Sequence, residues 1–225
     1  MTTDFSDLHQ TIAAILEKEI SEVPESYNKK RPYQSYERIQ FPGIRWSVEK
    51  RITEYGLTRF LGADKVVLDI GSNFGFFVTE FAMTGGSAHG VEWNGYLNDI
   101  GRATAQALGV SGKVDFFTCS FEDFIAPLQY DVVFSLAAFY TADGHERTAA
   151  RDYFGKVEAM LKPGGVVFYE STSYTKTEGS EAYSHYLART SVLDWLRENM
   201  ELVEEYETPS GSDGYFRQFA VARRV

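Results

Sequence analysis

The stretch Val66-Val67-Leu68-Asp69-Ile70-Gly71-Ser72-Asn73-Phe74-Gly75-Phe76-Phe77 decides the fold expected for this chain. Its apolar start is typical of a parallel strand that is buried on both faces. Gly71 and Gly75 belong to a turn, and neither carries a side chain that would block a ligand. The apolar segment after the turn predicts a helix whose free backbone N–H groups point at whatever lies over the turn. The stretch therefore predicts a strand, a ligand-binding turn and a helix.

An acidic residue follows at the spacing found in α/β nucleotide-binding folds. Glu92 comes directly after the strand-like segment 87–91 and lies 21 residues beyond Gly71. An acid about 20 residues past the glycine turn binds the hydroxyls of a ribose. A dinucleotide is not the expected ligand, because its fingerprint requires glycine where this chain has Asn73 and Phe76. The carboxylate of Asp69 suits instead a ligand with a cationic end, such as an amino-acid ammonium.

The segment 69–75 resembles the first motif of class I S-adenosylmethionine-dependent methyltransferases, whose common form has glycine at the position of Asn73. Segments 114–123, 130–136 and 161–170 resemble the third, fourth and fifth strands of that family, in the same order. The resemblance covers about residues 66–171 and implies S-adenosylmethionine as the cofactor. The cofactor-binding residues that it implies are Asp69, Gly71, Ser72, Asn73, Gly75, Glu92, Trp93, Ser120, Phe121 and Ser135. Arg45 is a candidate for binding a carboxylate of cofactor or substrate, with a surface salt bridge as the alternative.

The remaining pattern predicts an α/β fold in one sheet. Helices are expected over about 5–20, 47–60, 74–84, 94–108, 146–161 and 191–199, with shorter helical structure near 121–127. Segments 200–207 and 215–222 predict a hairpin. The resemblance implies a doubly wound, seven-stranded, mostly parallel sheet (a Rossmann-like methyltransferase fold), with the last strand antiparallel and next to the fifth. We expect residues 1–46 to form an N-terminal helical cap and lid, and residues 47–225 to form the S-adenosylmethionine-binding domain.

Composition excludes several classes of protein. The 225 residues carry a net charge of −10, which argues against nucleic-acid binding because phosphate contacts need Lys and Arg. No apolar run is long enough to span a membrane, and the first residues lack the features of a secretory signal. The single cysteine, Cys119, excludes an intramolecular disulfide and a cysteine-cluster zinc site. Cytoplasm is the expected location.

The loop at 136–145 argues for a small-molecule acceptor. It lacks the motifs by which DNA amino-methyltransferases, RNA cytosine methyltransferases and protein arginine methyltransferases resemble one another. Asp143 and Glu170 alone are an incomplete ligand set for metal-dependent catechol methylation, so we expect no metal. For each aromatic residue in the list that follows, ordinary packing in the core or at the surface is the alternative to substrate binding. The candidate substrate-binding residues are Tyr33, Tyr36, Trp46, Phe139, Tyr174, His185 and Tyr186, and segment 171–189 is a candidate lid.

The expected reaction is methylation of an O or N atom of a metabolite. If the acceptor must lose a proton, we assign His145 as the base and the Tyr140 hydroxyl as its orienting group, because histidine accepts protons near neutral pH. A surface His145 that caps the next helix is the alternative, and His185 is the second candidate base. A tRNA-modifying methyltransferase that uses 29–31 as a phosphate contact, and a non-catalytic binding protein, are the other functions considered. A homodimer is left open.

Overall fold

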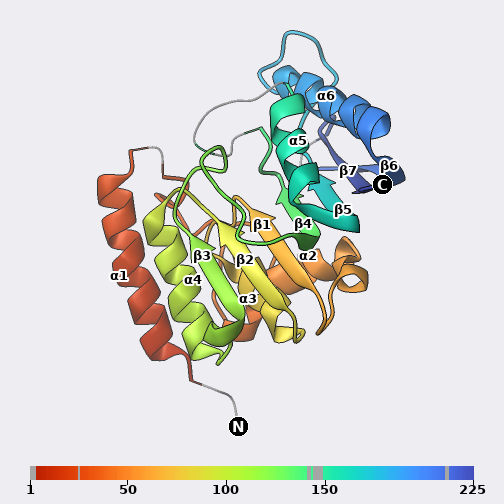
Figure 1. Cartoon of the computed structure of the whole chain (residues 1–225). Helices are drawn as coiled ribbons and strands as arrows, with labels where there is room; N and C mark the ends of the chain where they lie inside the picture. Colours follow the sequence, from red (N-terminus) through yellow and green to blue (C-terminus); the bar gives the residue numbers. More distant parts are fainter. Residues whose placement is uncertain (1–3, 25, 141–142, 144–148, 211–212) are drawn as a thin grey trace. The chain divides into compact units, whose positions relative to one another are not determined.

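The computed structural model describes residues 4–24, 26–140, 143, 149–210 and 213–225 (Figure 1). Within these ranges seven strands form one sheet in the order β3-β2-β1-β4-β5-β7-β6. The chain divides into two compact units. The first contains Met1–Val66 and Ser72–Cys119, and the second contains Val67–Gly71 and Ser120–Val225. The predicted seven-stranded α/β fold is confirmed.

The first unit contains the N-terminal helix and the first two helices after the glycine turn. Its elements are α1 (Ser6–Glu22), α2 (Val48–Glu54), α3 (Phe76–Met83), β2 (Ser87–Val91), α4 (Gly95–Ala107), β3 (Val114–Phe117) and three 3-10 turns, Glu37–Ile39, Leu57–Phe60 and Ser111–Lys113. Figure 1 shows α1 in red alongside α4 in yellow-green. The apolar face predicted for α1 is buried, with Leu8, Ile12 and Leu16 each at most 8% exposed.

Strands β2 and β3 are parallel, with Gly90 opposite Phe116. The Phe116 ring packs against two glycines, one before α3 and one within α4. A Cβ atom on Gly75 would lie 2.4 Å from Phe116 Cε1, and one on Gly101 would lie 2.7 Å from the same ring atom. Glycine at these two positions therefore lets the helices approach the strand closely.

The second unit contains the remaining strands and the C-terminal helices. Its elements are β1 (Val66–Ile70), β4 (Tyr130–Leu136), α5 (Arg151–Met160), β5 (Leu161–Glu170), α6 (Tyr183–Asn199), β6 (Glu201–Pro209) and β7 (Phe216–Arg223). Strands β1, β4 and β5 are parallel, so their carboxyl ends lie at one edge. Strand β7 is antiparallel to both β5 and β6, which confirms the predicted hairpin and its place next to the fifth strand.

Several helix assignments differ from the sequence-based prediction, including α5, which begins at Arg151 rather than near 146. Helix α6 begins at Tyr183 rather than near 190, and the stacked rings of Tyr183 and Tyr186 lie in its first turn. The helix predicted over 47–60 is divided at Gly56, whose φ of 61° is left-handed. Residues 121–123 form a turn and 124–127 are also not helical, so the short helix expected near 121–127 is absent. In the part of the chain that the structure describes, no helix has both the length and the apolarity needed to cross a membrane.

Candidate functional site

The glycine turn alternates left-handed residues with ordinary ones. Gly71, Asn73 and Gly75 have φ values of 67°, 53° and 67°. Asparagine is one of the few non-glycine residues that adopt this conformation readily, which explains how the chain tolerates Asn73 where the common motif has glycine. Ser72 N donates to Val91 O at 3.1 Å, so the turn is hydrogen-bonded to the carboxyl end of β2.

Glu92 is the buried carboxylate of the first unit that lies against this turn. Glu92 is only 7% exposed. Asn73 N donates to Glu92 Oε2 at 3.1 Å, and Asn94 N donates to Glu92 Oε1 at 3.0 Å. Each carboxylate oxygen can accept more than one hydrogen bond. Glu92 is therefore held against the turn by backbone N–H groups of Asn73 and Asn94.

The polar atoms of the turn fit a ligand with hydrogen-bonding groups. Among the described residues, Ser72 Oγ and Asn73 Oδ1 are buried side-chain atoms without a hydrogen-bond partner. Such atoms are uncommon in folded proteins and call for an explanation. A bound ribose or amino-acid group would supply partners here. Trp93, next to Glu92, is 47% exposed and offers an aromatic face.

In the second unit, Asp69 lies on β1 opposite Phe134 of β4 and is 3% exposed. Gly71 follows at the carboxyl end of this strand. A Cβ atom on Gly71 would lie 3.2 Å from the Cβ of Ala138, so glycine there allows the segment after β4 to approach. Ser135 is fully buried, and its hydroxyl is hydrogen-bonded to Tyr153 Oη at 2.9 Å.

The turn after β3 contains Ser120 and Phe121, which the sequence assigned to the cofactor. Ser120 Oγ donates to Asp123 Oδ2 at 2.7 Å and accepts from Asp123 N at 3.0 Å. Phe121 N donates to Asp143 Oδ1 at 2.5 Å. Sequence reasoning considered Asp143 only as a metal ligand and missed this contact, because nothing local links residues 22 positions apart.

A histidine and a tyrosine from different segments meet in the second unit. The rings of Tyr140 and His185 are 4.2 Å apart and T-shaped, and Tyr140 Oη is hydrogen-bonded to Ser184 Oγ at 3.0 Å. His185 Nδ1 lies 2.7 Å from Ser173 O. A carbonyl only accepts, so Nδ1 carries the hydrogen and the neutral ring has its lone pair on Nε2. His145, the first candidate base, lies outside the described residues.

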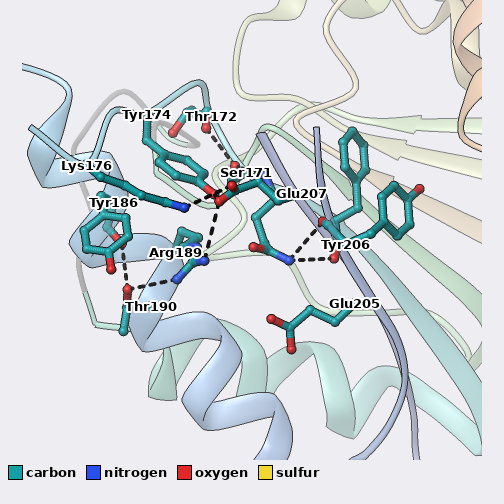
Figure 2. Close-up of polar contacts among 12 residues, drawn as sticks. Ser171, Thr172, Tyr174, Lys176, Tyr186, Arg189, Thr190, Glu205, Tyr206 and Glu207 are labelled. Atoms are coloured by element: carbon teal, nitrogen blue, oxygen red, sulfur yellow. Dashed lines mark hydrogen bonds and ion pairs between the residues drawn. The ribbon is translucent and has the colours of Figure 1, made fainter. Parts of the chain in front are cut away.

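A charged and aromatic cluster anchors the segment that follows β5 (Figure 2). The Tyr174 hydroxyl donates to Glu207, and Lys176 Nζ donates to Glu207 Oε1 at 3.0 Å. The guanidinium of Arg189 lies over the rings of Tyr174 and Tyr186, at 5.4 Å and 5.1 Å from their centroids. The segment 171–189, predicted as a lid, is thus held to β6 through Glu207, and its residues 183–189 already belong to α6. Within this segment Ser173 O accepts from His185.

Comparison with known protein families identifies the domain. Residues 67–165 match a family described as "Methyltransferase domain". Residues 67–165 therefore form a methyltransferase domain. No curated protein sequence matches the chain significantly.

Solved structures share the methyltransferase fold at low sequence identity. The N-methyltransferase NodS from Bradyrhizobium japonicum WM9 is 18% identical, with a TM-score of 0.61 over 78% of this chain and 96% of NodS. Geranyl diphosphate C-methyltransferase from Streptomyces coelicolor A3(2), in complex with Mg2+, geranyl diphosphate and S-adenosyl-L-homocysteine, is 15% identical, with a TM-score of 0.62 over 79% of this chain and 81% of that one. YjhP from E. coli is 15% identical, with a TM-score of 0.63 over 79% of this chain and 93% of YjhP.

The other candidate residues of this methyltransferase occupy varied environments. Tyr36 is fully buried, and its hydroxyl donates to Glu80 at 2.5 Å. Trp46 is 57% exposed under the ammonium of Lys50, and the guanidinium of Arg45 lies over the Tyr33 ring. Phe139 is buried against two aromatic rings of α5. The roles assigned to these residues stay predictions.

Proposed function

We propose that the protein transfers the methyl group of S-adenosylmethionine to an O or N atom of a small metabolite. The observation that carries the proposal is Glu92, a buried carboxylate held by two backbone N–H groups beside a left-handed glycine turn, within a methyltransferase domain. The NodS structure crystallised with S-adenosyl-l-homocysteine supports the same cofactor.

The cofactor supplies a methyl group on a sulfonium, so the leaving group is neutral and already activated. In the first unit, Glu92 would accept hydrogen bonds from the ribose, and Trp93 would pack against the base. Asp69, Ser120 and Phe121, which belong to the second unit, are assigned to the cofactor by the sequence resemblance alone. These residues bind and orient the cofactor, which is most of what this reaction requires.

The acceptor side of the proposal centres on His185. Its Nδ1–H is donated to Ser173 O, and Tyr140 packs against its ring. This arrangement leaves Nε2 to accept a proton from a hydroxyl or amine as it attacks. Tyr140 is 3% exposed and limits rotation of the ring, while His185 itself is partly exposed and so can be reached by an acceptor. We assign the proton to His185 Nε2, and His145 stays the alternative base.

A small acceptor is favoured over nucleic acid. The net charge of −10 would repel a phosphate backbone. The Lys29 ammonium, part of the candidate phosphate contact at 29–31, donates to the backbone oxygen of Pro24. The geranyl diphosphate and NodS enzymes show that this fold serves different acceptors.

Calorimetry with S-adenosylhomocysteine and with NAD tests the cofactor. We expect saturable binding of the first and none of the second; the reverse would refute the proposal. Mass spectrometry of small hydroxyl and amine compounds incubated with protein and S-adenosylmethionine then tests methyl transfer. A gain of one methyl group that needs active protein identifies the acceptor atom class, and methylation of tRNA alone would contradict the small-molecule assignment.

The role of residues 1–46 as a lid over the acceptor also stays a proposal. Deletion of residues 1–30 tests it through turnover. We expect turnover to fall strongly if this segment covers the acceptor, and normal turnover by the truncated protein would contradict the lid.

A further inference from the structure

The first unit contains a second buried carboxyl group, that of Glu19, which shares the hydrogen-bond partner Asn94 with Glu92. Glu19, on the buried face of α1, is 1% exposed. Its Oε2 accepts from Ser26 Oγ at 2.6 Å and from Asn28 Nδ2 at 3.4 Å. Its Oε1 accepts from Asn94 Nδ2 at 3.1 Å. Burial of a polar group is costly unless it is hydrogen-bonded, so these contacts determine how α1 sits on α4.

Asn94 connects Glu19 to Glu92. Its Oδ1 accepts from Tyr96 N at 3.1 Å and so caps the start of α4. Its Nδ2 donates to Glu19, and its own backbone N–H donates to Glu92 Oε1 at 3.0 Å. Both polar atoms of the Asn94 side-chain amide are therefore held, while the backbone N–H of the same residue donates to Glu92. The hydrogen-bonded series Glu19, Asn94, Glu92 therefore runs from α1 to the carboxylate at the end of β2.

We propose that Glu19 and Asn94 are positioning residues for the cofactor, because together they hold the Glu92 carboxylate in the orientation that binds the ribose. The inference rests on the proposed function, which assigns the ribose to Glu92. Its physical basis is preorganisation: a carboxylate already held in its binding geometry loses less freedom when the ligand arrives. It makes α1 part of the cofactor-binding apparatus, a role distinct from that of a lid over the acceptor.

The substitution Asn94→Asp breaks the series at one point. Aspartate retains the capping oxygen for Tyr96 and the backbone N–H for Glu92, but it loses the Nδ2 donor and places a second carboxyl group against Glu19. We expect the dissociation constant of S-adenosylhomocysteine, measured by calorimetry, to rise about tenfold, as for loss of one hydrogen bond to a charged group.

The double variant Glu19→Gln with Asn94→Asp exchanges donor and acceptor. The new glutamine amide donates to the new aspartate, and its oxygen still accepts from Ser26 and Asn28. We expect the double variant to bind S-adenosylhomocysteine more tightly than Asn94→Asp alone. Because this exchange also restores the net charge, the comparison with Glu92→Ala is needed to separate loss of positioning from an effect of added charge.

The matched control is Glu22→Gln. Glu22 lies on the same helix and accepts from the Tyr96 hydroxyl on α4, but among the described residues it makes no hydrogen bond to the Asn94 side chain itself. We expect Glu22→Gln to bind S-adenosylhomocysteine with the same affinity as the wild type. The melting temperature of each unliganded variant is measured in parallel, so that affinity and stability are separated.

A double-mutant cycle that combines Asn94→Asp with Glu92→Ala, read out as affinity for S-adenosylhomocysteine, decides the question. If Asn94 acts through Glu92, Asn94→Asp should not weaken binding further once Glu92 is removed. Additive losses, wild-type affinity in Asn94→Asp, or equal losses in Glu22→Gln would overturn the inference. If Asn94→Asp does not fold, Glu19→Gln replaces it in the cycle with the same criteria. Failure of the wild-type protein to bind S-adenosylhomocysteine would instead refute the proposed function.

Discussion

The surroundings of Glu92 and of His185 are both built from hydrogen bonds, but they are specified differently. Glu92 is held by backbone N–H groups of Asn73 and Asn94, the second of which is only two residues away. His185 is oriented by a carbonyl 12 residues away and by a ring from residue 140. The environment of Glu92, the proposed ribose-binding residue, therefore follows from the path of the backbone, whereas that of His185, the proposed base, depends on packing against a ring from another segment.

The largest expected effect is at the acceptor side. His185→Gln should lower kcat by about 10²–10⁴-fold, because the group that accepts the proton is removed. The matched variant His145→Gln, in which the other candidate base is replaced, should then retain most of its turnover. Steady-state kinetics with the identified acceptor measure both. The opposite ranking would assign the proton to His145, and unaffected rates in both variants would mean that no histidine accepts it.

Substitution of Gly75 tests whether close packing at the glycine turn is needed for stability. Gly75→Ala should destabilise the protein by about 3 kcal/mol, because the new methyl group would lie 2.4 Å from Phe116 in a left-handed residue. Gly109→Ala is the control: its φ is 71° but nothing lies within 4 Å of the added Cβ, so about 1 kcal/mol is expected. Urea denaturation measures both, and equal effects would mean that contact with Phe116 is unimportant.

Removal of the Glu92 carboxylate tests whether this residue binds cofactor. Glu92→Ala should weaken S-adenosylhomocysteine binding by about 2 kcal/mol, the loss expected for charge-assisted hydrogen bonds. Calorimetry measures the change. Wild-type affinity in this variant would show that the buried carboxylate serves the glycine turn alone.

The smallest expected effect concerns the cluster around Glu207. Partial burial raises the pKa of this carboxyl, but hydrogen bonds from Tyr174 and Lys176 and attraction to Arg189 outweigh it and leave the pKa below the ordinary 4.5. A lowered pKa stabilises the folded state above pH 4.5, and this contribution is lost as the pH falls through the lower folded-state pKa.

Glu207→Gln should therefore flatten the loss of stability between about pH 5 and pH 3. At neutral pH, Tyr174→Phe should cost about 1 kcal/mol through its lost hydrogen bond. Urea denaturation at several pH values measures both changes. An unaltered pH dependence in Glu207→Gln would show that solvent screens the cluster.

The sequence by itself determined the sheet, its glycine turn and the acid at the end of β2. These features depend on short-range properties: apolar runs form buried strands, and the left-handed positions at 71 and 75 require glycine. The spacing from Gly71 to Glu92 corresponds to one helix between neighbouring strands. The carboxylate was therefore predictable from that separation alone.

Tertiary structure alone decided the pairings made between distant side chains. Nothing local in the sequence indicates that Glu19 accepts from Asn94, 75 residues away, or that Tyr174 donates to Glu207. The early start of α6 also escaped prediction, since its first turn is occupied by aromatic residues whose packing, rather than intrinsic propensity, favours the helix. Such contacts form only after the elements have packed, because they join side chains that are distant in the sequence.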